Sequence, residues 1–206
     1  MMAAEEEYQE VEEEEDGELV FQATDEEEPP LIGLVGDITE ESMQQVVLAL
    51  LTYNGGALLH DDHTIFEDAE DIEFFISSAG GSVNDMFAIH DVMELVKENR
   101  DIATFGYGKI HSAAVPLLAA GTKGKRHIAK HARLMLHHCS TNIGGPQPTV
   151  RANFSELKQV EDMMVQVLVD HSNLSAGEIF NIFSKNIDEY FSAEEALEMG
   201  LVDKII

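Results

Sequence analysis

Three features of this sequence suit acyl transfer, a reaction that needs a nucleophile, a base and hydrogen-bond donors for the developing oxyanion. The first is Ser112, which follows the predicted strand Ile102–Tyr107 and opens the apolar segment Ala113–Gly121. A hydroxyl at the start of a predicted helix suits a nucleophile, because the helix dipole favours oxyanion chemistry there. A serine that only caps the helix occupies the same position. From the residues alone, both interpretations of Ser112 stay open.

The second feature is His137, which ends the predicted strand Arg133–His137. A histidine at this place is either a general base or a satisfied residue at the rim of the core. His138 and Cys139 follow it and suggest metal ligands, but adjacent residues of a strand point to opposite faces and do not readily share one ion. The cluster His60–His63 is also ligand-like and falls in a predicted surface loop. We expect no metal and no cofactor.

The third feature is the segment Ser78–Ser82, which holds Gly80 and Gly81 between a predicted strand and a predicted helix. Paired glycines let the backbone approach another group closely, and the first turn of a helix has unpaired N–H donors. Such donors can stabilise an oxyanion. A purely structural turn would contain the same residues, so the segment alone indicates no function.

The elements that must position these residues alternate between short apolar strands and amphipathic helices. The predicted strands are Leu31–Val35, Ile72–Ile76, Ile102–Tyr107, Arg133–His137 and Leu201–Ile206. The predicted helices contain the stripe Met43–Leu51, the stripe Met86–Val96, residues 113–120, residues from about 150 to 171, and the capping box Ser192–Glu195. Residues 53–71 are polar and are predicted to form a long loop. This alternation predicts an α/β architecture with right-handed crossovers.

Composition limits the possible classes of protein. A chain of 206 residues with 44% apolar residues is long enough for one domain with a sizeable core. The longest apolar runs, such as Val46–Leu51, are too short to span a bilayer, and nothing resembles a signal peptide. The single cysteine, Cys139, excludes an intrachain disulfide and fits a reducing compartment. We therefore expect a soluble cytoplasmic protein without a membrane partner.

The formal charge of -28 argues against a nucleic-acid partner, because phosphate contacts need clustered Lys and Arg. Much of this charge is local, since residues 5–28 contain fourteen acidic side chains and no basic one. Such blocks usually remain disordered. We therefore predict an acidic tail over residues 1–30, either simply solvated or acting as a docking or gating arm, and a folded domain over residues 31–206.

Four motifs in this domain resemble ClpP, the catalytic subunit of the ATP-dependent Clp protease. In chain order, they are Phe75–Val83, His111–Ser112 with the sequel Leu117–Arg126, Arg133–His137, and Asp188–Ala196 with Gly200–Asp203. In the family, the corresponding segments hold a glycine-rich turn, the nucleophile, the catalytic histidine and the catalytic aspartate. The resemblance implies a ClpP/crotonase-like α/β fold of repeated strand–helix units, with a protruding handle helix.

The resemblance assigns roles to individual residues. It implies that Ser112 is the nucleophile, that His137 is the base and that Asp188 orients the base, with the amides of Gly81 and Ala113 as the oxyanion hole. Substrate-binding candidates are Gly80, Ser82, Val83, Gly144 and Gly145.

The resemblance also implies a homo-oligomer. It predicts two stacked heptameric rings joined through the helix near 150–171, peptides of unfolded proteins as substrates, and a hexameric Clp ATPase as a partner. The acidic tail replaces the family's usual N-terminal hairpin, so the ATPase is the least supported of these partners. Asn186-Ile187 also replaces an acidic–Arg pair that normally links the rings.

Three alternatives share the fold. A virus-encoded head-maturation protease would act on a scaffold or capsid protein in the host cytoplasm. An inactive ClpP-like subunit would only build or regulate a ring. A crotonase-type acyl-CoA enzyme would share the oxyanion hole, but would have no reason to keep Ser112, His137 and Asp188 together.

Overall fold

The computed structural model describes residues 30–54, 70–141 and 143–206. The predicted acidic tail up to residue 29, most of the predicted loop 53–71 and the cluster His60–His63 lie outside the described residues. The seven strands are β1 (Leu31–Val35), β2 (Ile72–Ser78), β3 (Ile102–His111), β4 (Arg126–Ile128), β5 (Arg133–Leu136), β6 (Glu189–Phe191) and β7 (Lys204–Ile205). The six helices are α1 (Glu40–Tyr53), α2 (Val83–Lys97), α3 (Ala114–Ala119), α4 (Gln147–Asp170), α5 (Ala176–Ser184) and α6 (Ala193–Glu198).

The strands form one sheet, and the predicted α/β class is confirmed. Its main path runs in the order β1-β2-β3-β4-β7, with all neighbours parallel, while β5 lies parallel to β3 and β6 pairs antiparallel with β5. Strand β3 pairs with both β4 and β5, because its first half contacts β4 at Thr104–Gly106 and its last residues contact β5 at Lys109–His111. This division places the end of β5 beside the end of β3.

Strand β3 is longer than predicted. The predicted strand ends at Tyr107, just before Gly108 and Lys109. The strand continues because Ile110 is fully buried and pairs with Leu134 of β5.

Three short elements were not predicted. Strands β4 and β6 are three residues each and carry no apolar run. Helix α5 begins at a capping box between Ser175 and Glu178, a signal that is readable in the sequence. The last strand, β7, has two residues, fewer than the predicted Leu201–Ile206.

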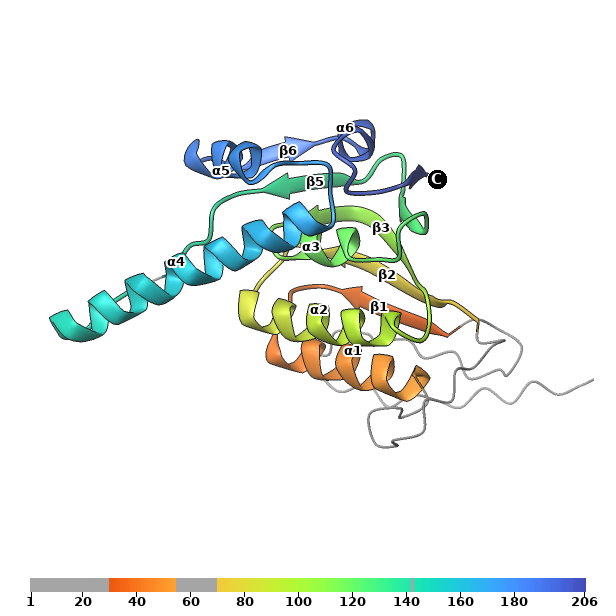
Figure 1. The fold of residues 1–206 in the computed structure, drawn as a ribbon, viewed down its shortest axis with the longest axis horizontal. Helices are drawn as coiled ribbons and strands as arrows, with labels where there is room; N and C mark the ends of the chain where they lie inside the picture. Colours follow the sequence, from red (N-terminus) through yellow and green to blue (C-terminus); the bar gives the residue numbers. More distant parts are fainter. Residues whose placement is uncertain (1–29, 55–69, 142) are drawn as a thin grey trace, which may run out of the picture.

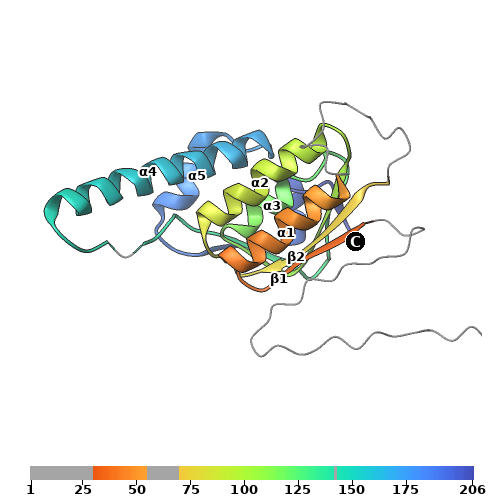
Figure 2. The ribbon, with the colours of Figure 1, turned by 90° about the horizontal axis from the view of Figure 1, so that it is seen from below.

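Helices α1 and α2 pack side by side against the sheet (Figures 1 and 2). Each shows a stripe of buried side chains, such as Val46 and Leu50 of α1 and Met86 and Ile89 of α2. Phe74 of β2 is also fully buried in this core. Burying a large apolar side chain contributes about 1.5–3 kcal/mol, so this layer helps to stabilise the fold.

Helix α4 projects from the body of the molecule (Figure 1). Residues 147–159 are mostly exposed, whereas Val160, Met164, Val165 and Leu168 in the second half are buried. One half of the helix therefore belongs to the core, and the other half forms the predicted protrusion. Among the described residues, we find no helix with both the length and the hydropathy required to cross a bilayer.

Candidate active site

Ser112 lies immediately after β3 and has a φ of 54°. This left-handed backbone conformation is rare for a residue with a side chain and costs about 1–3 kcal/mol. It is held in place because the Ser112 amide donates to the Met135 carbonyl at 2.7 Å and the Ser112 carbonyl accepts from the Val115 amide at 3.0 Å. The N-cap of α3 is Ala113, and no side chain caps this helix. The interpretation of Ser112 as a capping serine is therefore wrong.

His137 follows β5 directly, as Ser112 follows β3. Because β3 and β5 are parallel and pair His111 with Met135, their carboxyl ends meet at one edge of the sheet. The Nε2 atom of His137 lies 2.8 Å from the Oγ atom of Ser112. The half-buried imidazole can therefore accept the hydroxyl proton when Nε2 is unprotonated.

Gly80 and Gly81 approach this pair from the turn between β2 and α2. Their φ angles are 89° and 150°, which a residue with a side chain rarely adopts. Gly81 forms a bridge with Ile38, because the Gly80 carbonyl accepts from the Ile38 amide at 2.8 Å and the Ser82 amide donates to the Ile38 carbonyl at 2.9 Å. Among the described residues, no hydrogen bond uses the amide of Gly81 or of Ala113. Both N–H groups are available to a ligand.

Asp188 lies in the exposed connection between α5 and β6. Within the described part of the chain, it makes no hydrogen bond to His137. Its charge acts instead on the His111 imidazole. The pKa of His111 is lowered by burial and, to a smaller extent, by Lys109, whereas Asp188 raises it. The strand register pairs Leu136 with Glu189, so one further step of the same antiparallel ladder would set His137 opposite Asp188.

Ser112 and His137 line a small pocket of about 80 Å³. Gly81, Val83, Met164 and Phe183 are among its other lining residues. A larger adjoining pocket of about 270 Å³ lies against the exposed half of α4 and includes both Ser82 and Val83.

Three of the predicted substrate-binding residues line neither of these two pockets. Gly80 contacts the nucleophile segment through its backbone, and Gly144 and Gly145 are exposed before α4. By contrast, the lining residues Met164 and Phe183 were not predicted as site residues. The apolar stripe of α4 includes Met164, but a stripe does not distinguish a core residue from a pocket residue.

Comparison with known proteins decides the family. The family model described as Clp protease matches residues 31–206, the whole of the predicted domain. The chain belongs to the Clp protease family. It is accordingly a serine-type endopeptidase of the ClpP kind.

Relatives of this Clp protease include the ATP-dependent Clp protease proteolytic subunits 2 of three bacteria. The protein of Bifidobacterium longum is 36% identical over 137 residues, which cover 66% of this chain and 64% of the relative. Those of Corynebacterium glutamicum and Thermobifida fusca are each 37% identical, over 142 and 141 residues, and cover 68% of both chains. The chain thus aligns with just under two thirds of the first relative and slightly more of the other two.

His138 and Cys139, the neighbours of His137 in this Clp protease, make contacts of their own. Both ring nitrogens of His138 face oxygen atoms, Nδ1 the Cys139 carbonyl at 2.6 Å and Nε2 the Asn186 amide oxygen at 2.7 Å. These contacts raise the pKa of His138, the Cys139 carbonyl contributing most. Burial, with a smaller contribution from Glu161, raises the pKa of the Cys139 thiol to about 11. Cys139 is therefore a neutral thiol at neutral pH.

Proposed function

We propose that this chain hydrolyses peptide bonds through an acyl-enzyme formed on Ser112. The observation that carries the proposal is the 2.8 Å contact between Ser112 Oγ and His137 Nε2. In the first step, Oγ attacks the peptide carbonyl while His137 takes its proton and then passes it to the departing amine. In the second step, water attacks the ester, His137 accepts the water proton, and Ser112 regains its hydrogen.

The amides of Gly81 and Ala113 form the oxyanion hole in this proposal. Each is without an acceptor among the described residues, and both belong to segments that meet at Ser112. Donors held in place by the fold stabilise the oxyanion without reorganising, and loss of one such donor costs about 10²–10³ in turnover.

Asp188 is the orienting carboxylate in this proposal. The register of β5 and β6 supports this role, because the next pair along the ladder would be His137 and Asp188. Directly opposite residues have Cβ atoms about 4.5–5.5 Å apart. A carboxylate that accepts from the Nδ1–H group of His137 would keep Nε2 unprotonated and facing Ser112.

The substrate is an extended peptide lying along the two pockets. Ser82 and Val83 border the larger pocket, and Gly144 and Gly145 precede the helix that forms its other wall. A peptide strand pairing with the backbone of Gly80–Val83 would bring its carbonyl to Ser112. Backbone recognition of this kind suits unfolded proteins of varied sequence.

The assembly in this proposal consists of two stacked heptameric rings that enclose the active sites. The exposed apolar side chains Phe154, Met163, Phe180, Ile187 and Tyr190 lie on α4, on α5 and near β6. Large exposed apolar groups that cluster on one part of a surface indicate a protein interface. A hexameric Clp ATPase as a partner and a cytoplasmic location are parts of the same proposal. The first is supported by the relatives, which are proteolytic subunits of an ATP-dependent Clp protease.

Hydrolysis of short fluorogenic peptides by the purified protein tests the proposal. Ser112→Ala should lower turnover by several orders of magnitude, as in other serine peptidases. Ser155→Ala, at an exposed site on α4, serves as a matched loss of a hydroxyl and should keep at least half of the activity. Full hydrolysis by Ser112→Ala would refute the nucleophile, and an ordered wild-type particle without any hydrolysis would favour an inactive ring subunit.

A further inference from the structure

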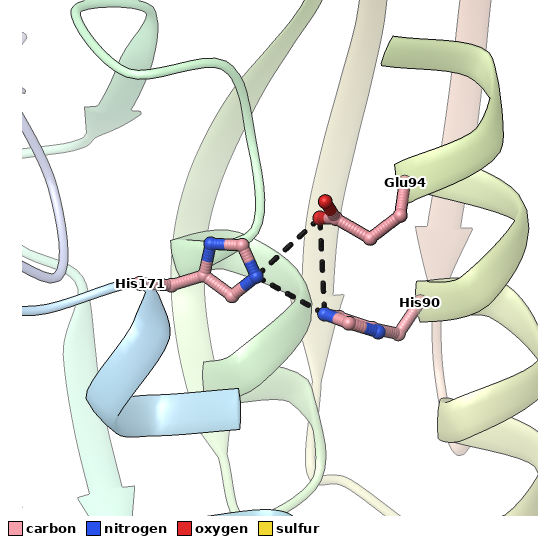
Figure 3. A group of neighbouring side chains, drawn as sticks. All are labelled: His90, Glu94 and His171. Atoms are coloured by element: carbon pink, nitrogen blue, oxygen red, sulfur yellow. Dashed lines mark hydrogen bonds and ion pairs between the residues drawn. The ribbon is translucent and has the colours of Figure 1, made fainter. Parts of the chain in front are cut away.

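A second group of reactive side chains lies where α2 meets the end of α4. His90 and Glu94 are one turn apart on α2, and His171 is the C-cap residue of α4 (Figure 3). Figure 3 shows both imidazoles and the carboxylate pointing toward one another. Together they are two nitrogen ligands and one oxygen ligand, a set that Zn²⁺ and similar cations bind in proteins.

The separations between the three ligand atoms match one bound ion. The Nε2 atoms of His90 and His171 are 3.1 Å apart, and the Oε1 atom of Glu94 lies 3.4 Å from His171 Nε2 and 3.8 Å from His90 Nε2. The circle through three atoms with these separations has a radius of about 2.0 Å, close to the zinc–nitrogen and zinc–oxygen bond lengths of about 2.0–2.2 Å. One ion can therefore reach all three atoms without any movement of the backbone.

The ligand atoms are largely withdrawn from solvent. The side chains of His90 and His171 are 11% and 16% exposed. Although the Glu94 side chain is half-exposed, its Oε1 atom is buried, and its close polar neighbours are Lys97 Nζ and the Nε2 atoms of the two histidines.

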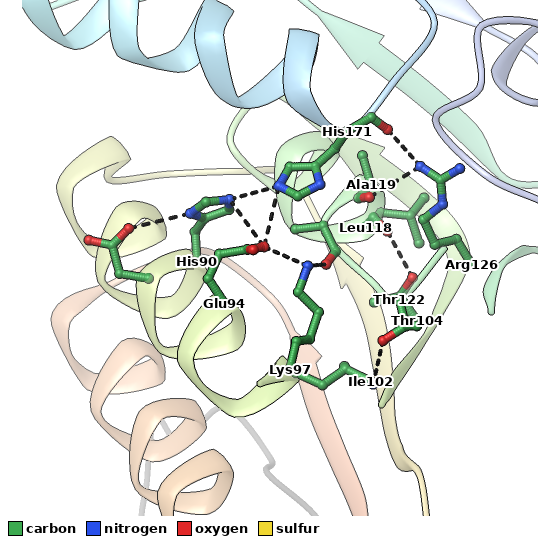
Figure 4. A network of polar contacts seen from close by, with 12 residues as sticks. His90, Glu94, Lys97, Ile102, Thr104, Leu118, Ala119, Thr122, Arg126 and His171 are labelled. Carbon is green, nitrogen blue, oxygen red and sulfur yellow. Dashed lines mark hydrogen bonds and ion pairs between the residues drawn. The ribbon is translucent and has the colours of Figure 1, made fainter. Parts of the chain in front are cut away.

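Surrounding groups hold the three ligands in place (Figure 4). The Nδ1 atom of His90 faces Asp91 Oδ1 at 3.4 Å, the usual support of a metal-bound histidine by a carboxylate. The backbone carbonyl of His171 accepts from Arg126 Nη1 at 2.6 Å.

Lys97 also contacts the cluster. Its Nζ atom lies 2.6 Å from Glu94 Oε1 and also donates to the Ala120 carbonyl at 2.8 Å. A carboxylate oxygen has two lone pairs, so Oε1 can keep Lys97 on one side and bind an ion on the other.

We propose that His90, Glu94 and His171 bind one first-row divalent cation, with Zn²⁺ as the best match, and that this ion ties α2 to the end of α4. Water would complete the coordination on the exposed side of Glu94. Because α4 contributes Met164 to the candidate active-site pocket, the ion would also stabilise one wall of that pocket. This site is independent of the proposed peptidase chemistry.

Cobalt binding to the full-length protein, stripped of metal by a chelator, tests the site. Co²⁺ should bind with one equivalent per chain and give the intense visible absorption of four-coordinate cobalt, and Zn²⁺ should displace it. His90→Ala and Glu94→Gln should each weaken binding at least tenfold. Added Zn²⁺ should raise the melting temperature of the wild type but not of Glu94→Gln, because a ligand that binds only the folded state stabilises it.

Two control variants separate this site from other ligands in the chain. His131→Ala removes an exposed histidine elsewhere and should leave Co²⁺ binding unchanged. A variant with both His60→Ala and His63→Ala should also keep the absorption. Circular dichroism of each variant verifies that it is folded. Absence of stoichiometric binding in the wild type, unchanged affinity in folded Glu94→Gln, or loss of binding in the His60 and His63 variant would each overturn the proposal.

Discussion

A methyl group added at Gly80 would lie 2.7 Å from the Cβ atom of Ser112 and 2.7 Å from the His111 carbonyl oxygen. Folded proteins do not tolerate such contacts without movement, and the φ of 89° at Gly80 already disfavours any side chain. The glycine therefore allows the turn before α2 to contact the nucleophile segment directly.

Gly80→Ala should consequently reduce both activity and stability. We expect kcat/KM to fall at least a hundredfold on peptide substrates, because Ser112 must shift relative to His137. The free energy of unfolding, measured with urea, should fall by about 1–3 kcal/mol. Gly144→Ala is the control, since no atom of the described residues lies within 4 Å of its added methyl group, and it should be nearly neutral for stability. Wild-type kcat/KM in Gly80→Ala would contradict the close contact.

Asp188→Asn tests the orienting role of this carboxylate. The amide cannot stabilise protonated His137, so kcat should fall at least about a hundredfold while KM changes little. Glu189→Gln removes a neighbouring charge that pairs with Lys185 at 2.5 Å, and should retain kcat within a few-fold. If both variants retain wild-type kcat, another group orients His137.

Cys139 should react slowly with alkylating reagents at neutral pH. Burial raises its pKa to about 11, so the reactive thiolate is scarce, about one molecule in a thousand at pH 8. The rate of alkylation by iodoacetamide, followed by mass spectrometry, should increase about tenfold per pH unit from pH 7 to pH 10. An unperturbed cysteine has a pKa of about 8.5, so its rate would level off above that pH. Such a plateau would show that the thiol is not buried.

Asp203→Asn should destabilise the fold near neutral pH. Burial opposes ionisation of Asp203, but hydrogen bonds from Arg126 and from the Gly124 amide outweigh it, so the pKa is below its usual value. Arg126 is almost fully buried and Asp203 mostly so. Breaking such a pair leaves a buried charge without a partner and costs about 3–5 kcal/mol.

The pH dependence follows from the direction of this pKa shift. A carboxylate with a lowered folded-state pKa contributes its full stability above the unfolded pKa of about 3.9, and loses it as the pH falls through the lower folded value. The difference in unfolding free energy between wild type and Asp203→Asn should therefore be large at pH 7 and shrink below pH 4. Asp162→Asn, at an exposed position on α4, should show little difference at either pH. A constant difference at both pH values would contradict the ion pair.

Much of the fold could be predicted from local patterns. The stripe of α2 has apolar residues three and four positions apart, and the helix forms as predicted after Ser82. Strand β1 has the predicted bounds, because its apolar run is flanked by Pro30 and Gly36. In contrast, β4 and β6 have no signal of their own, since their short segments become strands only when neighbouring strands supply hydrogen-bond partners.

The candidate site was predicted from family motifs rather than from chemistry. Taken singly, Ser112 and His137 each had a simpler structural explanation, and four motifs in the right order outweighed those explanations. The resemblance did not reveal that Ser112 has a left-handed backbone, or that Met164 and Phe183 line the pocket. It also did not point to His90, Glu94 and His171, although a His and a Glu four residues apart on a helix are a readable signal.

The sequence by itself determined the longer helices, the approximate positions of the longer strands and which face of each is apolar, because these properties depend on residues a few positions apart. Only the tertiary structure decided which distant side chains meet. His137 reaches Ser112 because β5 adds to β3 in a parallel register, and His171 reaches His90 because α4 ends against α2. Such contacts depend on strand order and helix packing, which join segments 25 and 81 residues apart and leave no periodic trace in the sequence.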